Sequence, residues 1–283
     1  MDWYVGSEWI SDRKGLRKKV LDINFKKLEK PSEIAIVVIV VKEMHQLNER
    51  PSAILSNDKV GQEQTLEMGR ALTPIDCYIE QILCQMMAGE SAECFIKTKS
   101  TEKEISFILT LLQIIASREL FTLKLPELYQ LARQYKENGV AMFKEYPIFA
   151  HAYFARAAKF MISYKPFDNL TLANDGVDGK DLQTFFINIQ TNLAACLLQQ
   201  KRYEHVLYQT QFVETALDPS EKSCYRRALA YYNIKEFEAA LGTIEKIPKY
   251  MEKKDFAKLH ASIIESRKTS NNQYKNVVQR MFH

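Results

Sequence analysis

The chain has 283 residues, of which 46% are hydrophobic and 26% are charged. This composition is typical of a folded globular protein and is too apolar for a disordered one. The net charge of +4 is spread along the chain without a polybasic block, which argues against a general nucleic-acid-binding protein. The longest apolar run, 34–41, has eight residues and is too short to cross a bilayer.

The cysteines and the N-terminus predict a protein of a reducing compartment. The number of cysteines is odd and no CxxC pair occurs, so we expect reduced thiols packed in cores. The first thirty residues mix acidic and basic side chains, unlike a secretory signal. We therefore expect a cytoplasmic protein that could also enter the nucleus. The cysteines are Cys77, Cys84, Cys94, Cys196 and Cys224.

Residues 1–116 have the pattern of an α+β domain. Residues 74–90 place apolar side chains at helical spacing, and Gly89 stands where a helix would end. Strands are expected on both sides of this helix, because short β-branched or alternating runs flank it. Several strands around one amphipathic helix predict an α+β half-barrel. The expected strands are residues 34–44, 64–69, 92–97 and 104–114.

Residues 191–241 contain the same helix pair twice. Asn192, Ala194 and Leu197 recur 34 residues later as Arg226, Ala228 and Tyr231. A period of 34 residues with a small residue at the helix crossing is the signature of the tetratricopeptide repeat, TPR. An earlier copy, 135–160, has Gly139 at the small-residue position and an apolar stripe of Ala150, Phe154 and Ala157. Between these copies, residues 165–183 are rich in Asp, Asn and Gly and predict a loop.

These patterns divide the chain into four parts. The last part, rich in apolar residues at helical spacing such as Phe256, Leu259, Ile263 and Ile264, is expected to cap the last repeat, whose apolar face would otherwise be exposed. The predicted parts are an α+β domain at 1–116, a linker at 117–125, three repeats at 126–252 and a capping helix at 253–283.

The order of elements resembles a known family. A short strand ending in Met68-Gly69, a helix with the tail Met86–Glu90 and two closing strands resemble the FKBP-type prolyl isomerase domain. Such a domain followed by three repeats is similar to the large immunophilin co-chaperones, in particular to members whose isomerase domain has degenerated. The resemblance implies an α+β FKBP-like half-barrel, then an all-α TPR array with a C-terminal capping helix. It also implies that the basic segment 274–283 could bind calmodulin, although we favour capping alone.

The resemblance implies that the isomerase chemistry is lost. Ile79 stands where the family has the tryptophan floor of its pocket, and Gln64 stands where it has an aromatic wall. The family's covering loop with Ala-Tyr-Gly is missing from residues 94–107. We therefore expect a non-enzyme that uses no cofactor. No metal site is expected either, because the histidines share no metal-ligand spacing; they include His45, His151, His205 and His260.

A set of cations in the repeats predicts a peptide site. The first helices of TPR repeats line one groove, and Lys222 and Arg226 lie four residues apart on one face of such a helix. Asn192 lies one period before Arg226, and Lys136 is near the equivalent place in the first repeat. Ammonium, guanidinium and amide groups suit carboxylates. The resemblance equates these four residues with the carboxylate clamp that binds the C-terminal Glu-Glu-Val-Asp of heat-shock protein 90 or 70, and places Val140 where many clamps have a hydrogen-bonding side chain.

Three functions follow as hypotheses. The first is a non-catalytic co-chaperone that binds a chaperone tail through the repeats and a client or second partner through the FKBP-like domain. The second is a weakly active prolyl isomerase with tethered repeats. The third is a TPR scaffold that binds an internal peptide in a signalling or germline complex, which the substitution at Val140 would permit.

Overall fold

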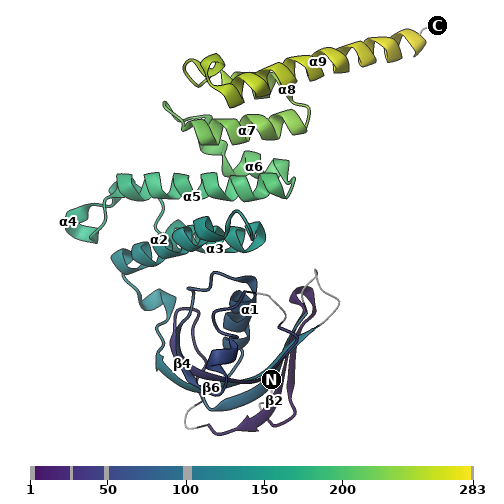
Figure 1. Cartoon of the computed structure of the whole chain (residues 1–283). Helices are drawn as coiled ribbons and strands as arrows, with labels where there is room; N and C mark the ends of the chain where they lie inside the picture. The colour runs from purple at the N-terminus through teal and green to yellow at the C-terminus, as the bar shows by residue number, and fades with distance from the viewer. Residues whose placement is uncertain (1–3, 26–27, 48–50, 98–103, 282–283) are drawn as a thin grey trace. The chain divides into compact units, whose positions relative to one another are not determined.

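The computed structural model describes residues 4–25, 28–47, 51–97 and 104–281. The chain divides into two compact units, Met1–Phe149 and Ala150–His283. The first contains a curved antiparallel sheet with a helix against its concave face, and the second is a stack of helices (Figure 1). Within the described ranges, no helix is long and apolar enough to span a membrane.

The sheet has six strands in the order β1-β2-β5-β6-β3-β4, with antiparallel neighbours. Its strands alternate between buried and exposed side chains, as in β5, where Ala92, Cys94 and Ile96 are all fully buried. This alternation directs one face of the sheet towards the helix. The strands are β1 (Glu8–Ser11), β2 (Leu16–Ile23), β3 (Ile36–His45), β4 (Glu63–Glu67), β5 (Glu90–Ile96) and β6 (Ile105–Ala116).

Helix α1 (Pro74–Leu83) supplies the other half of this core. Thr73 is its N-cap and accepts a hydrogen bond from the Asp76 N–H at 3.2 Å. The helix is shorter than the 74–90 predicted, and Gly89 does not cap it. Gly89 instead has φ 91° in the turn before β5, where a Cβ atom would lie 2.0 Å from the Asn24 carbonyl oxygen. Only glycine fits this turn.

A buried ion pair fastens that turn to the sheet. Lys18 on β2 is 1% exposed and Glu90 is 0% exposed, and their charged groups are in direct contact. The Lys18 ammonium also donates to the Gln85 carbonyl at 2.7 Å, and the second Glu90 oxygen accepts the Met87 N–H at 2.9 Å. Because both charges have hydrogen-bonding partners, burial is tolerated here.

Helix α2 (Leu125–Met142) belongs to the same compact unit as the sheet. The Asn138 amide donates to the Gly69 carbonyl at 2.9 Å, and the Arg118 guanidinium lies 2.8 Å from the Glu127 carboxylate. The first helix of the predicted repeat array is therefore packed on the FKBP-like part. Between Ala116 and this helix lies one short 3-10 helix, η3 (Leu120–Thr122).

The remaining helices follow the predicted pairs. The stripe of Ala150, Phe154 and Ala157 is buried, as predicted. The predicted loop 165–183 is partly wrong, because it contains short helices and α5 already begins at Gly179. The elements are α3 (Pro147–Ile162), η4 (Phe167–Asn169), α4 (Leu172–Asp175), α5 (Gly179–Gln199), α6 (Tyr203–Gln209), η5 (Gln211–Val213), α7 (Glu221–Asn233), α8 (Phe237–Ile244), η6 (Tyr250–Glu252) and α9 (Lys254–Met281).

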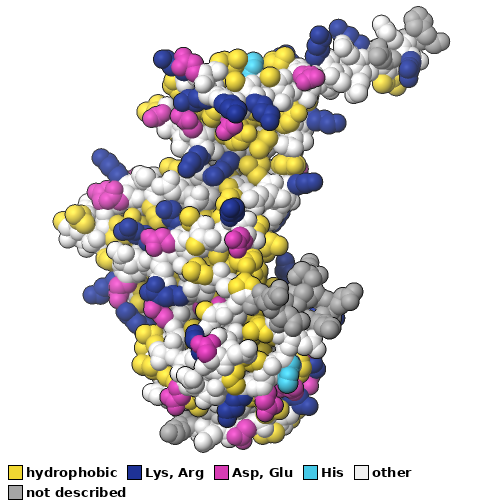
Figure 2. Space-filling model, viewed as in Figure 1, with side chains coloured by type: hydrophobic (Ala, Val, Ile, Leu, Met, Phe, Trp, Pro, Cys, Tyr) yellow, Lys and Arg dark blue, Asp and Glu magenta, His cyan; other side chains and the backbone are white. Residues whose placement is uncertain are grey.

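Helix α9 packs through its first half only. Phe256, Leu259 and Ile263 are buried at 5%, 5% and 0% exposure, as a capping helix requires. Ile264, expected in the same stripe, is 42% exposed, and Tyr274 is 71% exposed. The second half projects from the helical stack with Lys and Arg side chains along it (Figures 1 and 2).

Candidate functional site

Helices α5 and α7 bring part of the predicted carboxylate site together. The Arg226 Nη1 atom donates to the carbonyl oxygen of Thr191 at 2.5 Å, and Thr191 precedes Asn192 on α5. Thr191 is itself fixed, because its hydroxyl donates to the Ile187 carbonyl at 2.7 Å. Arg226 therefore lies beside the turn of α5 that carries Asn192, in agreement with their spacing of one repeat.

The charge of this region is not neutralised within the described residues. Arg226 is half-buried and Lys222 is exposed, and no carboxylate of the described ranges forms an ion pair with either. Burial lowers the pKa of Arg226 from its ordinary value, although a guanidinium stays charged at neutral pH. Lys222 stands in the first turn of α7, where the helix dipole adds partial positive charge. The surface therefore favours an anion.

Lys136 and Val140 both lie on α2. Lys136 is half-buried, whereas Val140 is 57% exposed. They belong to the unit Met1–Phe149, and the other three predicted residues belong to the unit Ala150–His283. Their assignment to the same site rests on the repeat spacing.

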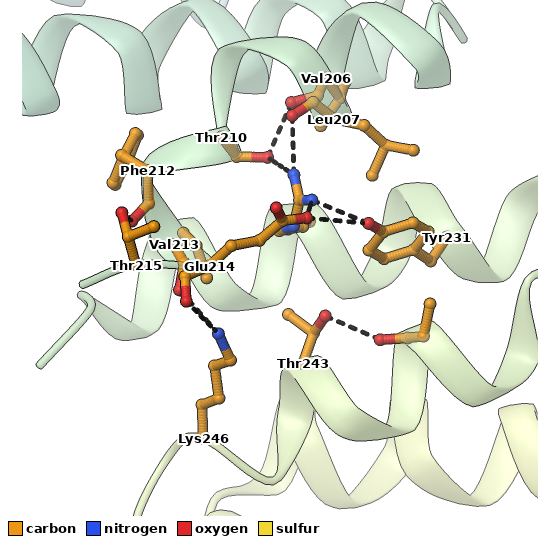
Figure 3. A network of polar contacts seen from close by, with 12 residues as sticks. Val206, Leu207, Thr210, Phe212, Val213, Glu214, Thr215, Tyr231, Thr243 and Lys246 are labelled. Atoms are coloured by element: carbon orange, nitrogen blue, oxygen red, sulfur yellow. Dashed lines mark hydrogen bonds and ion pairs between the residues drawn. The ribbon is translucent and has the colours of Figure 1, made fainter. Parts of the chain in front are cut away.

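Arg227, next to Arg226, has a structural role. It is 4% exposed and its Nη1 donates to the Leu207 carbonyl at 2.7 Å and to the Thr210 hydroxyl at 3.3 Å. Its Nη2 contacts the Glu214 carboxylate and the Tyr231 hydroxyl, the latter at 2.8 Å (Figure 3). The adjacent arginines of α7 thus differ, because Arg227 is buried and bonds to α6 and Glu214, whereas Arg226 is half-buried and bonds to α5.

Of the two positions that the resemblance assigns to an isomerase pocket, Ile79 lies in the core of the first unit and Gln64 is half-buried on β4. Ile79 on α1 is 0% exposed and shares one hydrophobic cluster with Ile54 and Leu55, which follow β3. Gln64 on β4 donates from its amide to the Ile54 carbonyl at 3.2 Å. Ile54 and Leu55 therefore belong to the same core as Ile79, where the resemblance places the pocket floor.

Asp76 holds this segment in place. Its carboxylate is 3% exposed and accepts hydrogen bonds from the Ser52 hydroxyl at 2.5 Å, the Ala53 N–H at 2.9 Å and the Ile54 N–H at 3.3 Å. The Ser52 oxygen in turn accepts the Leu55 N–H at 2.8 Å. We name residues 52–55 the plug segment. A buried carboxylate with several donors is a strong anchor for a loop.

Glu80, also on α1, binds the turn that follows β4. One of its oxygens accepts the N–H groups of Gly69, Arg70 and Ala71 at 3.0, 3.2 and 3.1 Å. Burial raises the pKa of this carboxyl to about 7 and outweighs the effect of the three donors, which favour the charged form. Because Asn138 binds the Gly69 carbonyl, this turn connects α1 to α2.

Comparison with known proteins identifies the family. Residues 9–116 match the family model described as BDBT FKBP like N-terminal, and residues 124–208 match that described as Bride of doubletime-like, TPR domain. The chain is 51% identical to Protein Bride of doubletime of Drosophila melanogaster over 286 residues, covering 100% of both chains. The chain belongs to the Bride of doubletime family.

Solved structures are similar to this family member. A crystal structure of residues 1-211 of CG17282 is 47% identical, with a TM-score of 0.66, and covers 72% of this chain and 98% of that one. A multi-domain immunophilin from Arabidopsis thaliana is 15% identical, with a TM-score of 0.40, and covers 87% of this chain and 98% of that one. The two family models confirm the predicted FKBP-like sheet domain followed by a helical TPR region.

Sequence reasoning missed Asp76 and Glu80. Both lie on α1, whose apolar spacing predicts a helix. Their partners, however, are backbone N–H groups of other turns, and such contacts cannot be read from the spacing of side chains. One signal was available for Asp76, because Thr73-Pro74 starts a helix and a carboxylate in the first turn is typical there. Nothing in the pattern pointed to Ser52.

Proposed function

We propose that this protein is a non-catalytic adaptor whose helical region binds the C-terminal tail of a chaperone. The ligand is an acidic peptide that ends in a free carboxylate, such as the Glu-Glu-Val-Asp tail of heat-shock protein 90 or 70. The FKBP-like domain then presents a client or second partner. The family relationship supports an FKBP-like and TPR architecture, and the choice of ligand is our inference from the cations of α7.

The half-buried Arg226 is the observation that carries this proposal. A cation removed from water without a carboxylate partner is unfavourable, so a ligand carboxylate would gain a charge-assisted hydrogen bond there. Arg226 already has one N–H fixed on Thr191 at 2.5 Å, which positions the rest of the guanidinium and limits the entropy lost on binding. Lys222 and Asn192 would supply further donors.

Titration calorimetry of the full chain with an Asp-terminated Glu-Glu-Val-Asp peptide tests the proposal. Arg226→Ala should weaken binding about tenfold or more, because it removes a hydrogen bond of roughly 1.5–3 kcal/mol. Lys222→Glu should weaken it further through repulsion. Amidating the peptide's C-terminus should weaken binding as much as Arg226→Ala does. Val140→Asn should tighten the same complex, because it restores a polar side chain on α2.

The matched control is Lys180→Ala, which removes an exposed cation from the first turn of α5 and should leave affinity unchanged. Arg227→Ala cannot serve as this control, because that side chain is buried. Equal affinity for the acid and the amide, with binding retained by both, would contradict chaperone-tail docking and favour the alternative of a scaffold that binds internal peptides.

The proposed absence of isomerase activity rests on the plug segment. An isomerase pocket must admit a prolyl peptide, and Ile79 has no exposed surface while Ile54 and Leu55 are buried in the same hydrophobic core. We expect no acceleration of isomerisation in a short proline peptide and no binding of macrolide ligands. Ile79→Trp should not restore either, because a larger side chain would overpack this core. Catalysis that a macrolide inhibits would instead establish the alternative of a weakly active isomerase.

A further inference from the structure

A second groove lies in the helical unit, formed by α3, α5, α6 and η5, with a volume of about 660 Å³. Its α5 residues are Gln183, Phe186, Gln190 and Leu193, which share one helix face because they are three or four positions apart. At about 100° per residue, Asn192 points roughly 140° away from the centre of that face. This groove is therefore separate from the proposed carboxylate site.

Small residues and a broken helix create the groove. Ala155 and Ala158 of α3 leave space opposite α5. Helix α6 stops at Gln209 and the chain continues as η5, with the Thr210 hydroxyl bonded to the Val206 carbonyl at 2.8 Å. A longer helix would have extended the α6 wall in a straight line. The irregular end instead places Phe212 in the wall.

The floor is apolar and parts of the rim are apolar and exposed. Phe186 and Leu193 are 4% and 5% exposed and form the floor, whereas Ile162 and Tyr208 at the rim are 58% and 73% exposed. Exposing large apolar side chains to water to this extent is unfavourable. A partner side chain resting between them would bury both.

The uncompensated charge of the groove is positive. Lys159 and Lys165 line it, and no carboxylate of the described ranges pairs with either. Lys165 lies 3.9 Å from the centre of the Phe186 ring, so its ammonium is held over the floor. Glu214 is the acidic residue of the lining, and Arg227 already neutralises it. Charge complementarity therefore calls for an acidic occupant.

Four glutamines add a hydrogen-bonding surface. Each amide offers donors and an acceptor, and within the described part of the chain none of these side chains has a hydrogen-bond partner. An extended peptide presents alternating N–H and C=O groups that amides of this kind can satisfy. A helical ligand would offer few, because its backbone groups are paired internally. The glutamines are Gln183, Gln190, Gln209 and Gln211.

We propose that this groove binds an extended acidic segment of a partner protein. An apolar side chain of that segment rests on Phe186, Leu193 and Phe212, and a neighbouring carboxylate pairs with Lys159 or Lys165. The glutamine amides hold its main chain. Because no free C-terminus is needed, this interaction is independent of the proposed chaperone docking.

A displayed library of random twelve-residue peptides, each fused at its C-terminus to the display protein, tests this on the full chain. The fusion removes the free carboxylate that the other site would bind. The wild-type protein should enrich peptides that combine Asp or Glu with a large apolar residue. The double variant Lys159→Glu, Lys165→Glu should bind the enriched peptides at least tenfold more weakly, and Arg226→Ala should bind them as tightly as wild type.

Two further variants keep the result interpretable. Lys268→Glu with Lys275→Glu makes the same charge change on the exposed half of α9 and should leave binding unchanged. Ala158→Gln fills the groove without a charge change and should weaken binding, which matters if the double glutamate variant fails to fold. Equal binding by the groove variants, loss on Arg226→Ala, or no enriched acidic peptide would overturn the proposal. So would concentration-dependent dimerisation in sedimentation that the groove variants abolish, because the occupant would then be a second copy.

Discussion

The Ser52 hydroxyl lies 2.5 Å from the Asp76 carboxylate, so a loop residue after β3 is fastened to the first turn of α1. The same carboxylate holds the N–H groups of Ala53 and Ile54. In consequence Ile54 and Leu55 are drawn into the core, at 4% and 1% exposure. One buried acidic residue thus determines the path of the whole plug segment.

Asp76→Ala should destabilise the first unit by roughly 1–3 kcal/mol or more, because it leaves buried N–H groups without acceptors. Trp9 packs against the core of this unit, so tryptophan fluorescence during urea unfolding measures the effect. Asp58→Ala, which removes an exposed carboxylate that follows the plug segment, is the control and should change the midpoint little. An unchanged midpoint for Asp76→Ala would show that the hydrogen bonds between Asp76 and the plug segment do not stabilise the fold.

Arg227→Ala should destabilise the helical unit by about 1–3 kcal/mol or more, because the Leu207 carbonyl and the buried Thr210 hydroxyl lose the donor that joins α6 to α7. Glu214→Ala should have a smaller effect, because the Glu214 side chain is 52% exposed and its loss leaves Arg227 bonded to Leu207 and Tyr231. Thermal unfolding followed by circular dichroism compares the two. Similar melting temperatures for Arg227→Ala and Arg226→Ala would refute the division of roles between these arginines.

The stability of the first unit should fall as pH rises from about 4.5 to about 7 through Glu80. Its pKa is about 7 in the folded chain and 4.5 ordinarily, so within this window the folded state keeps a proton that the unfolded state releases. Glu80→Gln keeps an acceptor for the three N–H groups and removes the titration. The stability difference between this variant and wild type should therefore grow through the window, by up to about 3 kcal/mol, and level off above it. The prediction would be wrong if the unfolding midpoints of Glu80→Gln and wild type differed by the same amount at pH 5 and at pH 8.

Truncation should separate the two halves of α9. Removing residues 270–283 should leave the melting temperature of the helical unit nearly unchanged, because the packed side chains end at Ile263 and Ser266, whose hydroxyl bonds Tyr232 at 3.1 Å. Removing residues 254–283 should lower it markedly, because Phe256, Leu259 and Ile263 would no longer cover α7 and α8. If the shorter truncation is equally destabilising, the projecting half has a packing role.

The helical region could be predicted because its helix pairs repeat in the sequence at a fixed spacing. The 34-residue spacing placed Asn192 and Arg226 on adjacent first helices, and in the structure Arg226 reaches the carbonyl of Thr191 beside Asn192. Periodicity assigned Arg226 and not Arg227 to the predicted site, but it could not show which groups Arg227 bonds. Those bonds depend on where α6 ends and on the acceptors at Leu207 and Thr210.

The first domain was predictable in its strands and less so in its turns. β3 to β6 lie near their expected positions, but the apolar spacing of Met86 continues beyond Leu83, where α1 ends. Met86 is 0% exposed in the core although it is not helical. The apolar spacing at Met86 therefore indicated burial in the core and did not indicate a helix. The assignment of Ile79 and Gln64 followed from family resemblance, whereas the segment that packs on them was invisible without long-range contacts.

The packing of α7 against α5 and α6 also determines how this chain can be divided into fragments. Ala230 of α7 packs in one cluster with Ala194 and Leu197 of α5 and Val206 of α6, so a fragment that stops at 211 would expose these side chains to solvent. Such a fragment would keep the sheet, the plug segment and α5. It would lack Lys222 and Arg226, and it would also lack the Phe212 wall of the second groove. A partner that binds the whole chain but not this fragment would thereby be traced to the last quarter of the sequence in a single comparison.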